Sequence, residues 1–185
     1  MALAALAALG VAGVHAQTPT TPATPATPAP ASEVAAALGG AKLQGSGTLR
    51  FLGLRVYDAR LWAAATVPGA EWAAAPLALE LEYARSLDGV RIAERSLSEM
   101  RRQGDIAADV AERWLDAMKQ IFPDVKAGDR ITGVNVPGRG ARFFINGRLK
   151  GEVRDSNFAR YFFGIWLSPK TSEPGLRDTL LGKVT

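Results

Sequence analysis

The chain of 185 residues contains no cysteine and a single histidine, His15. Without cysteine it can form no disulfide, no thiol nucleophile and no cysteine-ligated metal site. His15 lies in an N-terminal segment that we expect to be removed, so the mature protein would lack histidine as well. These absences exclude Ser-His-Asp and Cys-His catalysis and the usual zinc ligands. We therefore expect neither a metal nor a cofactor.

Positive charge is in modest excess, and the formal net charge is +4. The sequence has no dense run of Lys and Arg and no basic helix face interleaved with aromatic residues. A solvated basic surface accounts for such an excess better than a nucleic-acid partner does. The sequence assigns no oligomeric state.

Residues 1–16 are apolar and rich in small residues, but too few to span a bilayer, which takes about 20 residues. Val14-His15-Ala16 matches the small-x-small pattern that precedes signal cleavage. No Lys or Arg precedes the apolar run, so a buried N-terminal helix is the alternative. We expect a signal peptide cleaved after Ala16, a periplasmic or secreted location, and no integral membrane segment afterwards.

Residues 17–32 form a Thr/Pro/Ala tract without charged or large apolar side chains. Such a tract buries too little surface to offset its ordering entropy and is typical of an extended tether. The composition of residues 33–185 is that of one globular domain.

The first half of this domain predicts strands. Residues 42–62 are β-rich with interspersed glycines, and predict either two consecutive strands or one long bent strand. Residues 77–85 alternate strictly. Leu77, Leu79, Leu81, Tyr83 and Arg85 fall on one face, whereas Ala78, Glu80, Glu82 and Ala84 fall on the other. We expect an antiparallel sheet with one covered and one solvated face.

Two helices and three further strands follow. Residues 86–104 carry a helical stripe from Val90 to Met100, with Asp88 or Ser86 as N-cap, and residues 105–122 carry a second, with Asp105 as cap. Strands are predicted within 129–137, 141–147 and 148–153, joined in part by an Asn-Gly turn. A helix capped by Asp155 or Ser156 and a short final helix end the chain. This order predicts an α+β fold with helices on one face of an antiparallel sheet.

The helix near the C-terminus is unusually aromatic. On it, Phe158, Tyr161, Phe162, Ile165 and Trp166 share one face. This face could form the core against the sheet, or part of it could roof an apolar cleft. Both interpretations hold together if the core lies at one end of the helix and the cleft at the other.

The segments "GSGTLRFLGLRVYDARLW", "LEYAR", "FPDVKAGDRITG", "FFINGRLKGEV" and "FARYFFGIWLSPKTSEPGLRDTLLG" resemble the chalcone isomerase-like family, in its bacterial exported branch. The resemblance covers most of residues 42–182. It implies an open-faced β-sandwich with a cleft between the sheet and a layer of helices. Plant members cyclise chalcones to flavanones, and fatty-acid-binding members use the same cleft without chemistry.

The catalytic positions of the enzymes do not carry over to this sequence. The resemblance implies that the enzymes use an arginine before the first long strand, a threonine on that strand, a tyrosine and an asparagine near the helices, and a C-terminal Ser/Thr. Alignment on Val56-Tyr57 puts Leu52 near the position of that threonine and offers only Lys42 near that of the arginine. The tyrosine and the C-terminal Ser/Thr positions fall near residues 102–104 and 163–165, which have no match. The resemblance therefore implies no catalytic residue, and enzyme activity is the less favoured alternative.

Other cations could serve the cleft instead. Arg50 alternates in step with Leu52, Leu54 and Val56, so its side chain would point toward the covered face of the sheet if no bulge intervenes. Arg85 ends the covered face beside Tyr83. A guanidinium at an apolar cleft suits a carboxylate or phenolate. Alternatively, these arginines reach solvent or pair with Asp58 or Glu82.

Asp58 has two interpretations of its own. A buried carboxylate there could act as a general base, but an ion pair with Arg55 or Arg60 is the favoured interpretation.

Three hypotheses follow. The favoured one is an exported, non-catalytic protein that binds a small apolar or fatty-acid-like ligand. Its predicted binding residues are Arg50, Leu52, Tyr57, Tyr83, Arg85, Tyr161 and Trp166. The second is an isomerase or intramolecular lyase using Arg50, Tyr57 or Tyr83. The third is a structural module of the cell envelope, which a fully packed cleft would favour.

Overall fold

Six strands form the sheet in a computed structural model that describes residues 28–183. Their bounds are β1 Lys42–Phe51, β2 Leu54–Ala63, β3 Leu77–Tyr83, β4 Arg130–Val136, β5 Gly140–Ile145 and β6 Arg148–Val153. The spatial order equals the chain order and every neighbouring pair is antiparallel. Residues 42–62 therefore form two strands, and the alternative of one long bent strand is wrong.

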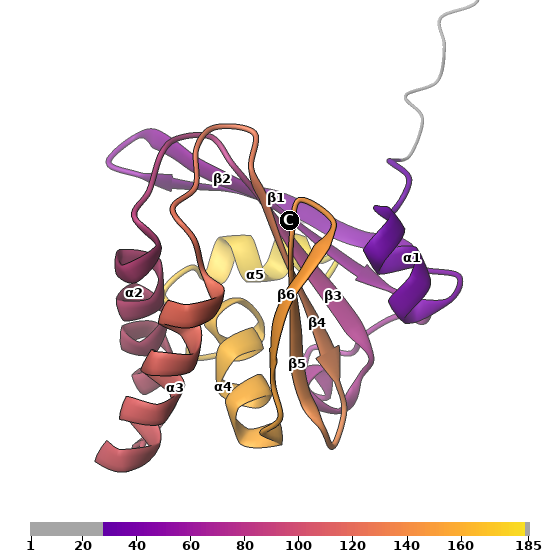
Figure 1. Cartoon of the computed structure of the whole chain (residues 1–185). Coiled ribbons are helices and arrows are strands. Elements are labelled where there is room, and N and C mark those ends of the chain that lie inside the picture. The colour runs from indigo at the N-terminus through magenta and orange to yellow at the C-terminus, as the bar shows by residue number, and fades with distance from the viewer. Residues whose placement is uncertain (1–27, 184–185) are drawn as a thin grey trace, which may run out of the picture.

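Within residues 28–183, five α-helices pack around the sheet. Their bounds are α1 Ser32–Leu38, α2 Gly89–Arg101, α3 Ala108–Ile121, α4 Ser156–Leu167 and α5 Pro174–Leu180, with a 3-10 turn at Trp72–Ala74. Figure 1 shows α2, α3 and α4 on one side of the sheet and α1 on the opposite side. The α+β fold with a helical layer on an antiparallel sheet is confirmed.

The alternation in β3 predicts the covered face correctly. Tyr57 of β2 pairs with Tyr83 of β3, and Leu81 of β3 pairs with Ile131 of β4. Directly paired residues share a face of the sheet, so these side chains all point toward the helices. Leu77, Leu79, Leu81 and Tyr83 are buried in the main core.

The opposite face is not solvated throughout, which corrects the expectation of one wet face. Glu80 is only 4% exposed, because α1 covers this side. Val34 of α1 packs there against Trp62, Ala78 and Val134. α1 begins at Ser32, which the sequence assigned to the tether.

Helix ends follow the predicted caps in part. The Asp88 carboxylate accepts a hydrogen bond from the Arg91 amide and caps α2. Asp155 caps α4 by accepting from the amides of Asn157 and Phe158. The predicted cap at Asp105 is wrong, since α3 starts after Ala107 without a side-chain cap.

The aromatic face of α4 contributes to the core. Phe158 and Phe163 are fully buried. Phe162 packs edge-to-face on Phe143 of β5, with ring centroids 5.0 Å apart, a geometry that aromatic pairs favour. These contacts fix α4 on the sheet and thereby place its last turn.

Candidate functional site

A cavity of about 390 Å³ lies between the sheet and the helices at the hairpin end of β1 and β2. We call it the inter-layer cavity. Its floor comes from the end of β1, the start of β2 and the end of β3, and its walls come from α2 and α4. The segment before α5 closes one side through Ser172 and Glu173.

Most of the lining is apolar. The aliphatic and aromatic side chains that face the cavity are Leu49, Phe51, Val56, Leu81, Leu87, Ile92, Phe122, Ile131, Phe162, Ile165 and Trp166. The end of α4 therefore roofs a cleft, while the preceding turns of the same helix fill the core. Both interpretations of the aromatic helix are correct, each for a different part of it.

Two tyrosines and a tryptophan form the polar centre of the lining. Tyr57 and Tyr83 are cross-strand partners, with ring centroids 5.8 Å apart in an edge-to-face arrangement. The Trp166 indole Nε1 donates a 2.9 Å hydrogen bond to the Tyr57 hydroxyl. Among residues 28–183, the Tyr57 hydroxyl hydrogen has no acceptor and the Tyr83 hydroxyl has no hydrogen-bond partner. Each tyrosine can therefore donate to a bound molecule.

Both tyrosines are neutral at physiological pH. Burial raises the pKa of Tyr57 well above its ordinary value, and the hydrogen bond from Trp166 only partly opposes this effect. Burial also raises the pKa of Tyr83, and neighbouring Tyr57 adds to the effect. Neutral phenols donate hydrogen bonds but do not act as general bases, so the pair suits recognition of an oxygen atom.

Arginines gather where the cavity meets solvent. Arg50, Arg85, Arg91 and Arg95 all contribute to the lining. Arg95 pairs with Glu99 at 2.6 Å. In the described region the other three guanidinium groups form no ion pair, and Arg50 contacts only the Gly53 carbonyl at 3.4 Å. Asp88, Glu99 and Glu173 also line the cavity, so its four arginines exceed its carboxylates by one, and only Arg95 forms an ion pair within residues 28–183.

Arg50 lines this mouth as expected, but a bulge intervenes, so strand parity is not the reason. The pairing of β1 with β2 shifts there, since Leu49 pairs with Tyr57 but Arg50 pairs with Arg55. Val56 is the extra residue, and such a bulge bends the strand and breaks its alternation. Leu49 and Tyr57 face each other on the covered side, and Val56 also lines the cavity, so the simple alternation through Leu52 and Leu54 is lost.

The prediction for Leu52 is wrong. Leu52 lies in the turn between β1 and β2, has a φ of 50° and is 86% exposed. It therefore does not line the cavity.

The prediction that Tyr161 belongs to the cleft is also wrong. Its ring packs on Trp114 of α3, with centroids 5.6 Å apart, and its hydroxyl lies 3.4 Å from the Asp105 carbonyl. Tyr161 occupies the outer side of α4, one helical turn before Ile165. The structure brings the remaining predicted residues, Arg50, Tyr57, Tyr83, Arg85 and Trp166, to one cavity.

The sequence analysis did not predict which residues of α2 line the cavity. Ile92, Ser96 and Glu99 line the cavity from successive turns of α2, whereas Val90 of the predicted stripe is 46% exposed. Ser96 and Glu99 are buried although they are polar. The i, i+4, i+7 spacing of these three was the available signal, but their polarity argued against a buried position.

Asp58 forms an ion pair with Arg55, as favoured from the sequence, and accepts a 2.7 Å hydrogen bond from Thr48. Hydrogen bonding from Arg55 holds the pKa of Asp58 below its ordinary value, although partial burial opposes this. A carboxylate held ionised outside the cavity is not placed to act as its general base.

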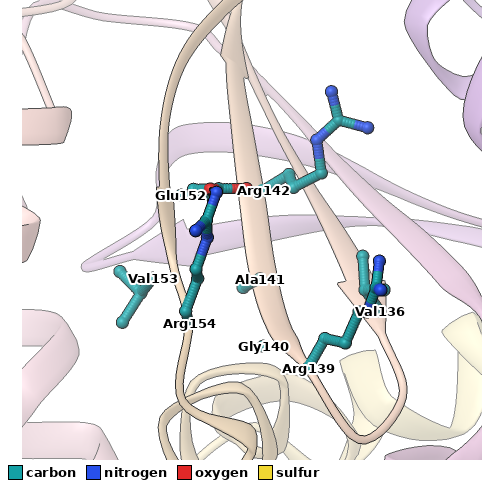
Figure 2. A pocket seen from close by; sticks show the side chains of 8 residues that line it. All are labelled: Val136, Arg139, Gly140, Ala141, Arg142, Glu152, Val153 and Arg154. Carbon is teal, nitrogen blue, oxygen red and sulfur yellow. Dashed lines mark hydrogen bonds and ion pairs between the residues drawn. The ribbon is translucent and has the colours of Figure 1, made fainter.

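A second hollow of about 430 Å³ lies along β5 and β6. Figure 2 shows the Arg154 side chain directed at Glu152, its ion-pair partner, whereas Arg142 extends away from the strands. The guanidinium of Arg142 lies over the Phe144 ring at 5.3 Å. Arg154 and Arg142 thus have partners, and the hollow lacks the extensive apolar walls of the inter-layer cavity.

None of the helices within residues 28–183 has both the length and the apolar character that a membrane crossing requires. In the same residues, no three His, Asp or Glu side chains come together as ligands for a metal ion.

Comparison with known proteins agrees with the fold resemblance. Residues 32–182 match the family model described as chalcone isomerase-like. An uncharacterized protein of Haemophilus influenzae is 30% identical over 112 residues, which are 58% of this chain and 52% of the relative. The chain thus spans about half the length of that relative.

The crystal structure of an Arabidopsis thaliana fatty-acid binding protein is similar to this chain, with a TM-score of 0.59 and 16% identity. The similarity covers 78% of this chain and 88% of that one. At this identity it shows a shared fold.

Proposed function

Since the chain belongs to the chalcone isomerase-like family, we propose that its inter-layer cavity binds a small apolar molecule with an anionic group, such as a fatty acid, and releases it unchanged. One observation carries the proposal. An apolar cavity of about 390 Å³ opens at a mouth where Arg50, Arg85 and Arg91 form no ion pair within residues 28–183.

The dimensions and lining of the cavity support this ligand class. Cavities that bind small molecules have volumes of about 300–1,000 Å³ and mostly apolar walls with a few polar groups. Each buried methylene contributes about 0.8 kcal/mol, so ten of them contribute roughly 8 kcal/mol before the cost of association is subtracted. Apolar burial would thus supply the affinity.

The polar groups would orient the ligand. A carboxylate at the mouth accepts charge-assisted hydrogen bonds from an arginine, which are stronger than neutral ones. Deeper in the cavity, Tyr57 and Tyr83 offer hydroxyl donors to a second oxygen or to a water molecule. The similarity to a fatty-acid binding protein supports the same ligand class.

The positions of the candidate cations argue for binding without chemistry. Lys42, which alone falls near the family's catalytic arginine, starts β1, whereas the cavity lies at the other end of this ten-residue strand. A strand of that length spans about 30 Å, so Lys42 cannot reach a ligand in the cavity. Leu52 is likewise outside the cavity.

An isomerase is the second candidate function. The Tyr57 and Tyr83 hydroxyls, with Arg50 at the mouth, could polarise the oxygen of an enone. Turnover of a chalcone or related enone that falls on Tyr57→Phe and Tyr83→Phe would support this candidate. Inactivity across a panel of such compounds would favour the binding protein.

A mass measurement tests the proposed function. Protein purified under mild conditions is examined by native mass spectrometry, before and after incubation with fatty acids of graded chain length. The proposal predicts a co-purified or added ligand at one copy per chain. Protein that stays empty with every fatty acid and phenolic compound offered would overturn it.

We further propose that residues 1–16 direct export and that the mature protein acts outside the cytoplasm; both segments, 1–16 and most of 17–32, lie outside the described residues. The proposal rests on the sequence pattern alone. Fractionation of cells that produce the full chain, with N-terminal sequencing of the mature form, tests it. A mature protein that begins at Gln17 in the periplasm or medium is expected, and an uncleaved cytoplasmic chain would contradict the proposal.

A further inference from the structure

The turn between β1 and β2 exposes apolar side chains. Phe51, Leu52 and Leu54 are 64%, 86% and 56% exposed, and we call these three residues the hairpin tip. Figure 1 shows the hairpin projecting past the rest of the sheet on the side of α2. Phe51 also lines the inter-layer cavity, so the hairpin tip adjoins the cavity mouth.

The turn itself does not explain Leu52. Leu52 and Gly53 both have positive φ, 50° and 78°, in a two-residue hairpin turn. The hairpin of β5 and β6 has the same form at Asn146 and Gly147, with φ of 48° and 84°. Asparagine tolerates this conformation, whereas leucine is strained in it. Leu52 therefore combines backbone strain with solvent exposure, which points to a role beyond folding.

Cations surround the hairpin tip. Arg50 and Arg55 flank the tip and occupy opposite positions in the register of β1 and β2. Arg85 and Arg91 lie at the adjoining cavity mouth. Of the carboxylates on this side, Asp58 pairs with Arg55 and Asp88 caps α2, whereas the exposed Glu173 lines the cavity as well. Arg50, Arg55, Arg85 and Arg91 still outnumber these three carboxylates. An apolar point within a positively charged rim complements an anionic surface that has an apolar interior.

We propose that the hairpin tip inserts into the surface of an anionic phospholipid bilayer, which places the cavity mouth at the lipid. The shape of the tip favours a bilayer over a protein partner. A stable protein interface takes about 800 Å² from each partner around an apolar centre, whereas this tip offers three side chains on a narrow hairpin. Transfer of an apolar ligand from the bilayer to the cavity would rest on the proposed function; insertion itself does not.

Vesicle flotation tests the insertion. The full chain is mixed with vesicles of phosphatidylcholine alone or with phosphatidylglycerol added, at low and high ionic strength. We expect the protein to float with the anionic vesicles and to dissociate as salt rises, because screening weakens the arginine contacts. Wild-type protein that stays unbound to anionic vesicles at low salt would overturn the proposal.

The decisive variant is Leu52→Asn, which removes the apolar side chain and relieves the turn. We expect about tenfold or greater loss of vesicle binding with an unchanged or higher melting temperature. Leu149→Asn is the matched control, because Leu149 is 55% exposed on β6, away from the cavity lining, and should leave binding unchanged. The apolar residues 1–16 are the same in all variants, so differences in vesicle binding between the variants arise from the hairpin tip.

Other outcomes would overturn the inference. Equal vesicle binding by Leu52→Asn and wild type would do so. Concentration-dependent self-association that Leu52→Asn abolishes, without vesicle binding, would assign the tip to a second copy of the chain. The test is independent of the proposed function, because ligand content in native mass spectra should be the same for Leu52→Asn and wild type.

Discussion

Trp166 Nε1 donates a 2.9 Å hydrogen bond to the Tyr57 hydroxyl and so joins α4 to β2 beside the inter-layer cavity. The bond uses the tyrosine oxygen as acceptor and leaves its hydrogen available to a ligand. The same contact therefore holds the two layers together and prepares a donor in the cavity.

Trp166→Phe should destabilise the fold by about 1 kcal/mol beyond the loss of ring volume, because a buried hydrogen bond is removed. Trp62→Phe is the control, since the buried Trp62 Nε1 has no hydrogen-bond partner among residues 28–183. Urea denaturation measures both. Equal destabilisation by the two substitutions would mean that the bond to Tyr57 contributes nothing.

Gly45→Ala should destabilise the protein by about 1–3 kcal/mol through overpacking. A Cβ atom at Gly45 would lie 2.1 Å from the Thr179 carbonyl oxygen, so α5 would have to move away from β1. Gly175→Ala is the control, because nothing lies within 4 Å of the added Cβ. A melting temperature of Gly45→Ala equal to that of the control would contradict the close packing of α5 on β1.

Glu33 should make stability depend on pH. Its carboxylate accepts hydrogen bonds from Arg130 at 3.0 Å and Thr132 at 3.1 Å. Burial opposes its charge, but its backbone hydrogen bond, Arg130 and Thr132 together hold the pKa of Glu33 below its ordinary value. A lowered folded-state pKa stabilises the protein above the unfolded pKa of about 4.3, and this contribution is lost as pH falls through the folded pKa.

Glu33→Gln should therefore cost stability at neutral pH and flatten the loss below about pH 5, as measured by urea denaturation across pH. The control is Asp109→Asn. Arg113 likewise lowers the pKa of Asp109, but both side chains are exposed, so little change is expected. Parallel curves for Glu33→Gln and wild type between pH 7 and 3 would refute the linkage.

Arg50→Ala should weaken the binding of a fatty acid roughly two- to fivefold, because an exposed charge pair contributes little in water. Binding of the fatty alcohol of equal length should not change, since it carries no anion. Arg148→Ala, an exposed arginine on β6 outside the cavity lining, is the control. A fluorescence displacement titration measures all three proteins, and equal losses for acid and alcohol would rule out a charge contact.

Much of the fold could be predicted from local patterns. The alternation in β3 gave its covered face, the Asn146-Gly147 pair gave a hairpin, and the helical spacing in α4 gave its packed face. Each of these signals depends on neighbours along the chain. The covering of Glu80 by α1 depends on contacts between residues remote in sequence. The residues of α1 follow the Thr/Pro/Ala tract, and their local pattern does not indicate that they pack on the sheet.

The site was predicted less completely for similar reasons. One extra residue, Val56, shifts the pairing of β1 with β2, and the pairing of Phe51 with Leu54 leaves Leu52 in the turn. Local alternation does not indicate such a bulge. Ser96 and Glu99 look like surface positions because polar residues seldom line a buried wall. Tyr57, Tyr83 and Trp166 line the cavity. Alternation placed Tyr83 on the covered face and helical spacing placed Trp166 on the packed face, whereas Tyr57 was chosen from the segment that resembles the family.

A matched pair of tryptophan substitutions tests whether the inter-layer cavity holds an apolar anionic ligand. Ile92 lines the cavity from α2, whereas Val110 is similarly half-buried on α3 and does not. Fatty-acid affinity is measured by displacement titration on Ile92→Trp, Val110→Trp and wild type, all checked for folding. We predict that Ile92→Trp fills the cavity and abolishes binding while Val110→Trp binds as wild type does. Undiminished binding by folded Ile92→Trp would show that the fatty acid does not occupy the inter-layer cavity.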